Sequence, residues 1–179
     1  MQVLNIHSRE LPVPAGKVGA LLDSLSSPDD LLWPKHLWPP MKFDKSLSVG
    51  ARGGHGPIRY DVAKYEPGKL VEFRFTGPTG FDGYHGYEVI EVDEETTELR
   101  QTLQMNTHGS ALLTWPFLFR PLHDALIEDS LTKAQLELGL PADIRKWSLW
   151  VRCLRWILTC GKALPQSFQT DSQLQKTAD

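Results

Sequence analysis

Cysteines, long apolar runs and targeting segments are scarce or missing in this sequence of 179 residues. The only two cysteines, Cys153 and Cys160, fall in one predicted helix, where seven residues of rise separate them by about 10.5 Å. That distance is too long for a disulfide between them, so we predict a reducing, cytoplasmic location. No run of about 18 uncharged apolar residues occurs, which argues against a membrane-spanning helix. The N-terminal MQVLNIHSRE has neither the basic nor the apolar region of a signal peptide.

Compact catalytic motifs are missing as well. The sequence contains no GxSxG nucleophile elbow and no HxH, HxxxH or HExxH metal motif. His85, His123 and Asp124 would meet only by an accident of folding, and Asp124 is expected on the far face of its helix. We therefore predict no metal site and no cofactor.

Charge is divided unevenly along the chain. Residues 1–140 carry 13 Lys and Arg against 19 Asp and Glu, whereas residues 141–179 carry 6 against 3. An acidic body repels a phosphate backbone, so nucleic acid is not an expected partner.

Hydrophobic periodicity predicts an α+β protein. A period near two at residues 3–11 indicates a strand, and 3.6-residue spacing from Val18 indicates a short helix. The proline-rich residues 28–44 leave room for at most one more brief helix. Further strands, joined by hairpin turns and therefore antiparallel, are predicted at residues 47–50, 58–65, 70–76, 84–92, 98–105 and 110–115.

A long helix is predicted after Trp115-Pro116, ending at Gly139-Leu140-Pro141. Its apolar stripe includes Ile127 and Leu131 and should pack on the sheet. Asp124 and Glu128 are expected to face away from that stripe.

Several stretches carry a resemblance to a known superfamily. WPKHLWPPM (33–41), GARGGHGPIRY (50–60), YEPGKLVEFRF (65–75), GYHGYEV (83–89) and RPLHDALIEDSL (120–131) resemble the SRPBCC superfamily of START-like, polyketide cyclase/dehydrase and pollen-allergen proteins. The resemblance covers residues 3–138. It implies a helix-grip fold, in which a curved antiparallel sheet of about six to seven strands wraps around a long C-terminal helix. Two short helices would follow the first strand, and a deep cavity would take a hydrophobic ligand.

The chain divides into three parts on this interpretation. Residues 1–140 form the START-like domain, residues 141–162 an appended basic amphipathic helix, and residues 163–179 a polar, disordered tail. The helix itself is expected at residues 143–162, with its arginines in one narrow polar sector.

Because members of the superfamily carry lipids, cyclise polyketides or bind proteins, the resemblance leaves function open. The leading hypothesis is binding of a hydrophobic or amphipathic small molecule, lipid-like or polyketide-like. The alternative enzyme would be a cyclase or dehydratase with His85 or His123 as general base and Tyr60 or Tyr87 as hydrogen-bond donor. The expected inner-face residues are Trp38, His55, Tyr60, Phe73, His85, Tyr87, Gln101, Leu103, Trp115, His123 and Ile127. A close-packed core without a cavity remains open.

The appended helix supports a third hypothesis. Tryptophans beside arginines are typical of a helix at a membrane interface, although packing on the body or on a second copy of the chain fits equally. The residues expected to make such a contact are Arg145, Trp147, Trp150, Arg152, Arg155 and Trp156.

The glycine cluster ARGGHGPIRY at residues 51–60 matches neither GxGxxG nor a P-loop, and it leads into a strand. Its glycines are expected to turn the chain between a strand at residues 47–50 and the strand from Ile58.

Overall fold

One seven-stranded antiparallel sheet organises the chain in the computed structural model, which describes residues 1–160. The predicted tail, residues 163–179, lies outside the described residues. The sheet order is β1-β7-β6-β5-β4-β3-β2, so the first strand pairs with the last. The strands are β1 (Gln2–Leu11), β2 (Lys42–Phe43), β3 (Arg52–His55), β4 (Ile58–Glu66), β5 (Leu70–Gly77), β6 (Phe81–Glu91) and β7 (Thr97–Thr107).

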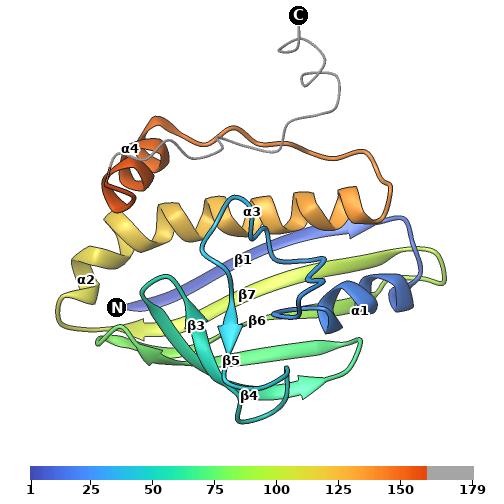
Figure 1. The fold of residues 1–179 in the computed structure, drawn as a ribbon, viewed down its shortest axis with the longest axis horizontal. Coiled ribbons are helices and arrows are strands. Elements are labelled where there is room, and N and C mark those ends of the chain that lie inside the picture. The colour runs from blue at the N-terminus through green and yellow to red at the C-terminus, as the bar shows by residue number, and fades with distance from the viewer. Residues whose placement is uncertain (161–179) are drawn as a thin grey trace, which may run out of the picture.

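One long helix, α3 (Arg120–Glu137), lies across the sheet (Figure 1). It is preceded by α2 (Ala111–Thr114) and by a π-helical turn, Trp115–Phe119. After β1 comes α1 (Ala15–Asp23), and then a single hydrogen-bonded turn in which the Leu37 and Trp38 N–H groups donate to the Pro34 carbonyl. The last described helix is α4 (Leu149–Leu158). None of the described helices is long and apolar enough to cross a bilayer.

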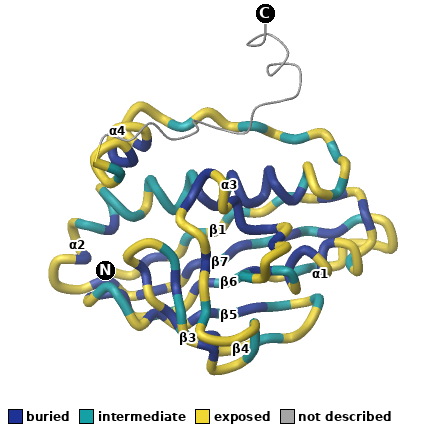
Figure 2. Tube along the Cα trace, in the orientation of Figure 1, coloured by how far each residue is buried: buried dark blue, intermediate teal, exposed yellow. Residues whose placement is uncertain are grey.

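Alternation along the strands decides which side chains meet α3. In β7 the odd-numbered residues from Thr97 to Thr107 are buried, and the even-numbered ones are partly or fully exposed. Buried residues accordingly concentrate on the central strands and in the C-terminal half of α3, where residues 129–134 are all buried (Figure 2). The predicted helix-grip fold is confirmed.

Two predicted strands are wrong. Residues 110–115 are helical: they hold α2 and begin the π-helical turn, so the apolar run before Pro116 belongs to the entry into α3. Residues 47–50 are bends and turns, and the sheet is instead extended by β2 and β3.

The role predicted for the glycine cluster is also corrected, because the turn into β4 is made by Gly56 and Pro57, and two other glycines lie inside β3. A Cβ on Gly53 would lie 2.0 Å from the Lys42 carbonyl oxygen of β2. On Gly54, where φ is +152°, it would lie 2.0 Å from the Ile58 carbonyl oxygen. These glycines let the backbones of neighbouring strands approach closely.

The appended helix is shorter than predicted. Residues 140–148, here called the strap, are irregular and run back along α3 before α4 begins at Leu149 (Figure 1). Ser148 caps α4, its hydroxyl accepting the Val151 N–H at 3.2 Å. The strap stays extended because its charged residues bind the body: Asp143 accepts from Arg9 of β1 at 3.0 Å. Residues 161 and 162, the predicted end of the helix, lie outside the described residues.

Candidate ligand cavity

A cavity of about 620 Å³ lies between the sheet, α3 and the segments that close its mouth. Ligand sites commonly measure about 300–1,000 Å³, so this volume suits a small organic molecule. Strands β5, β6 and β7 supply one wall, and the π-helical turn and α3 supply the opposite wall. The proline-rich segment, the Gly56-Pro57 turn and α4 line the rest of it.

Eight of the eleven predicted inner-face residues line this cavity. They are Trp38, His55, His85, Tyr87, Leu103, Trp115, His123 and Ile127. Tyr60, Phe73 and Gln101 are fully buried but lie behind the wall. Tyr60 supports the wall, because its hydroxyl lies 2.9 Å from His55 Nδ1.

Several residues that line the cavity were not among those predicted from the sequence. Phe75 shares the strand phase of the predicted Phe73, and Leu118, Leu122 and Leu126 follow helical four-residue spacing, so both signals were present in the sequence. Arg155, which also lines the cavity, carried no such signal, because its position depends on the course of the strap. Other unpredicted residues in the wall are Trp33, Leu37, Phe81 and Phe119.

Four histidines line the cavity: His36 lies in the proline-rich segment, and His55, His85 and His123 lie deeper in the wall. Burial lowers the pKa of His55 to about 3, with the neighbouring charges of His123 and Arg59 adding to the effect. Burial also lowers the pKa of His85 well below its usual value. For His123 the same effect of burial outweighs the opposing carboxylate of Asp124, and its pKa is lowered. The three imidazoles are therefore neutral near pH 7.

His85 stands out among these residues because it is surrounded by aromatic rings. Its ring centroid lies 4.7 Å from those of Tyr60 and Phe75 and 5.1 Å from that of Phe73. Within the described residues its Nε2 is buried and has no hydrogen-bond partner. Such a nitrogen can orient a ligand that carries one polar group.

The structure corrects the predicted position of Arg155, which was expected on an outward contact surface. It is 6% exposed, and its guanidinium carbon lies 4.2 Å from the Trp38 ring centroid and 4.0 Å from that of Trp147. It also donates to the Leu37 carbonyl. Cation–π contact with two indoles stabilises a charge that burial would otherwise disfavour. Trp147 is half-buried in this stack rather than available to a partner.

Asp129 of α3 ties the same cluster together. One of its oxygens, Oδ2, accepts the Trp38 indole N–H at 2.7 Å and the Trp147 indole N–H at 2.9 Å. Burial raises the pKa of Asp129 to about 6, although these hydrogen bonds and the charge of Arg155 oppose the increase. The proline-rich segment, the strap and α4 are therefore joined at one buried point.

The structure also corrects the predicted orientation of the polar face of α3. Asp124 and Glu128 were predicted to face away from the sheet, but both contact β1. Glu128 accepts from Arg9 at 2.9 Å and lies 2.8 Å from His7 Nδ1. The cause is the edge strand: His7 and Arg9 share the inward phase of β1 and reach up to the helix.

The fold and the cavity together define a helix-grip protein with a binding space between its sheet and α3. No family model matches the sequence, and no curated protein matches it. Solved structures do match. A protein from Thermobifida fusca, determined by solution NMR, has a TM-score of 0.59 at 16% identity, covering 78% of this chain and 95% of that one.

Two further matches are named proteins. Norcoclaurine synthase from Thalictrum flavum has a TM-score of 0.58 at 13% identity, covering 79% of this chain and 96% of its own. Ara h 8.0201 has a TM-score of 0.54 at 10% identity, covering 78% and 99%. Identities this low establish the shared fold and nothing further.

Proposed function

We propose that this protein binds a hydrophobic or amphipathic small molecule in the cavity between its sheet and α3. The observation that carries the proposal is the space of about 620 Å³ between the sheet and α3, whose wall is almost entirely apolar and aromatic. A close-packed core would leave few voids larger than a water molecule. Burial of apolar ligand surface in such a space supplies the binding free energy, and the neutral histidines supply a few polar contacts.

Charge on the wall favours an anionic group at the polar end of the ligand. Two cations, Lys35 and Arg155, are among the lining residues, and no Asp or Glu is. Across residues 1–160, no carboxylate oxygen lies within 4.0 Å of the Arg155 guanidinium. A carboxylate in the ligand would give this buried cation a direct ion pair in addition to the more distant charge of Asp129.

Titration with a neutral apolar fluorophore, N-phenyl-1-naphthylamine, tests both statements. We expect saturable binding of one probe per chain, followed by displacement by dodecanoate at lower concentration than by dodecanol. Absence of saturable binding would overturn the cavity proposal. Equal displacement by the acid and the alcohol would overturn the preference for an anion and leave the cavity proposal intact.

A second candidate function is a cyclase or dehydratase reaction, favoured by the pairing of His123 with Asp124. Asp124 Oδ1 lies 3.7 Å from His123 Nδ1, and His123 lines the cavity. A carboxylate beside Nδ1 favours the tautomer with its proton on that nitrogen, which leaves Nε2 as a base. His85 is the weaker candidate base, because burial holds its pKa well below the usual value. The norcoclaurine synthase match supports the view that this fold can host catalysis.

Glutamine substitutions separate the two candidate bases. If the protein catalyses proton abstraction from a carbonyl compound, His123→Gln should lower the rate by about 10²–10⁴-fold, while His85→Gln should mainly weaken binding. The measurement is turnover of a probe ketone by NMR deuterium exchange at its α-carbon, alongside a binding titration. Exchange no faster than in buffer for the wild-type protein would exclude this candidate and leave the carrier proposal standing.

A third candidate is contact with an anionic membrane surface through the outer face of α4. Exposed apolar side chains gather there, and the cation Arg152 lies on the same helix. The Trp150 indole N–H donates to the Phe117 carbonyl at 2.9 Å, so the π-helical turn adjoins this face. Its exposed apolar residues are Phe117, Leu149, Trp150, Trp156, Ile157 and Leu158. Indoles beside a cation suit the lipid headgroup region.

Co-sedimentation with phosphatidylserine vesicles tests this contact. We expect Trp156→Ser/Ile157→Ser to reduce bound protein by about tenfold, because two anchoring side chains are lost. The matched control is Leu4→Ser/Ile6→Ser, which removes exposed apolar side chains from the outer face of β1. Equal sedimentation of both variants would contradict the proposal, and a dimer in gel filtration without vesicle binding would assign the face to a second copy.

A further inference from the structure

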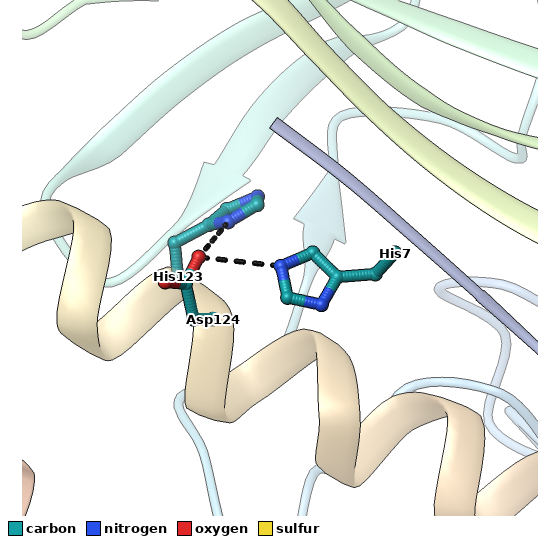
Figure 3. A group of neighbouring side chains, drawn as sticks. All are labelled: His7, His123 and Asp124. Atoms are coloured by element: carbon teal, nitrogen blue, oxygen red, sulfur yellow. Dashed lines mark hydrogen bonds and ion pairs between the residues drawn. The ribbon is translucent and has the colours of Figure 1, made fainter. Parts of the chain in front are cut away.

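Three side chains of the kinds that bind metals converge where β1 meets the start of α3 (Figure 3). His7 comes from β1, and His123 and Asp124 are consecutive residues of α3. Asp124 Oδ1 lies 3.2 Å from His7 Nε2 and 3.7 Å from His123 Nδ1, and all three atoms lie within 4.8 Å of one another. The other oxygen of Asp124, Oδ2, lies 3.7 Å from Arg120 Nε, which leaves Oδ1 for the cluster.

These separations are close to those of a tetrahedral metal site. Zinc bonds to imidazole nitrogen and carboxylate oxygen are about 2.0–2.2 Å long, which places tetrahedral ligand atoms about 3.3–3.5 Å apart. Two of the observed separations lie within a few tenths of an ångström of that range. The third separation, between the two imidazole nitrogens, is at most 4.8 Å, so a tetrahedral site would need these rings to approach by up to about 1.5 Å.

Unpartnered polar atoms surround the same cluster. Among the described residues, His123 Nδ1, Gln101 Oε1 and Asn5 Oδ1 are all buried without a hydrogen-bond partner. His123 Nε2 lies 3.4 Å from Gln101 Nε2, a contact between two nitrogens. A half-turn of the Gln101 amide would place Oε1 there instead, to accept a proton from His123 Nε2. His123 Nδ1 would then present its lone pair to the cluster.

Asn5 belongs to this arrangement as well. Its Nδ2 donates to Asp124 Oδ1 at 3.0 Å while its own Oδ1 has no partner within the described part of the chain. The same half-turn of this amide would direct a carbonyl oxygen toward the cluster. The turned Asn5 oxygen would face Asp124 Oδ1, so this reorientation is favourable only when a cation lies between the two oxygens.

Hydrogen bonds outside the cluster hold the His7 ring in the orientation that a metal ligand needs. His7 Nδ1 lies 2.8 Å from Glu128 Oε1, and the second oxygen of Glu128 accepts from Arg9 at 2.9 Å. A ligating histidine usually donates its other ring N–H to a carboxylate, which fixes the tautomer and orients the ring. Glu128 occupies that supporting position here.

From these contacts we infer a binding site for a divalent cation such as Zn²⁺, with His7 Nε2, His123 Nδ1 and Asp124 Oδ1 as its ligands. Two imidazoles and one carboxylate are a donor set suited to zinc and to neighbouring transition metals. The ion connects edge strand β1 to α3. It also fixes the proton of His123 on Nε2, whereas Asp124 without a bound ion would favour the proton on Nδ1 and leave Nε2 as a base. The inference is independent of whether the cavity binds a ligand.

Calorimetric titration of the chelator-treated full chain with Zn²⁺ tests this site, and Co²⁺ absorption spectra report its geometry. We expect one ion per chain and intense visible Co²⁺ bands typical of four-coordination. The variants His7→Gln and Asp124→Asn each remove one ligand and should weaken binding by about 100-fold or more, since even supporting residues change affinity by about 10–100-fold. His108→Gln is the matched control, because His108 is exposed in the loop after β7.

Thermal melts of the wild-type protein keep the test decisive if a variant folds poorly. Zn²⁺ in excess of its dissociation constant should raise the melting temperature, because it binds the folded chain. Unchanged Zn²⁺ affinity in both His7→Gln and Asp124→Asn would overturn the inference. So would the absence of Zn²⁺ binding and of a melting-temperature shift in the wild-type protein.

Discussion

Replacement of Asp129 by leucine is expected to lower the free energy of unfolding by about 2–4 kcal/mol, measured by urea denaturation at pH 7. The carboxylate accepts from the indoles of Trp38 and Trp147, and leucine leaves both donors without a partner. Each unsatisfied buried group costs about 1–3 kcal/mol. The proline-rich segment, the strap and α4 should loosen together.

Two further variants test whether the lost hydrogen bonds of Asp129 cause this destabilisation. Asp129→Asn keeps an oxygen for the indoles and should be no less stable than the wild type at pH 7. Because burial raises the pKa of Asp129 to about 6, ionisation costs the folded state stability. The wild type should therefore lose about 2–3 kcal/mol relative to Asp129→Asn as pH rises from about 4 to above 6.

Asp82→Leu, on the exposed side of β6, should change stability by less than about 0.5 kcal/mol. An equally small effect of Asp129→Leu would contradict the account of this cluster.

Filling the cavity from both walls should weaken ligand binding by about 10–100-fold. Leu103 of β7 and Ile127 of α3 line opposite sides, and Leu103→Trp/Ile127→Trp would place two indoles in the space. A ligand that must displace well-packed side chains loses about 1–3 kcal/mol or more. The readout is titration with N-phenyl-1-naphthylamine, with the probe excited directly so that the added tryptophans do not contribute.

The matched control places the same residue type on the opposite face of the sheet. Leu4 and Ile6 are 63% and 53% exposed on β1, so Leu4→Trp/Ile6→Trp adds two indoles without entering the cavity. It should bind the probe like the wild type. Loss of binding in this control alone, or in neither variant, would show that the probe binds elsewhere.

Much of the fold could be predicted because its determinants are periodic. Alternation in β7 and β5, and helical spacing around Ile127, each depend on residues adjacent in sequence. The same patterns identified part of the cavity wall, including Tyr87, Leu103 and Ile127. The prediction failed at residues 110–115, where an apolar run without a clear period was assigned to a strand but forms the entry into α3.

The strap and the β1–α3 contact could not be predicted, because both depend on pairs far apart in sequence. The strap has spacing compatible with a helix, yet ion pairs of Asp143 and Arg145 with Arg9 and Glu128 keep it extended. That course carries Arg155 into the cavity wall. His7 and Asp124 are separated by 117 residues, so no local motif could reveal their contact.

A crystal structure of the complex with N-phenyl-1-naphthylamine would show whether the space between the sheet and α3 binds a ligand. We expect density for the naphthyl ring inside the cavity, in contact with Leu103 and Ile127 and within reach of His85. Density confined to the exposed apolar face of α4, with side chains closing the space between α3 and the sheet, would contradict the cavity proposal.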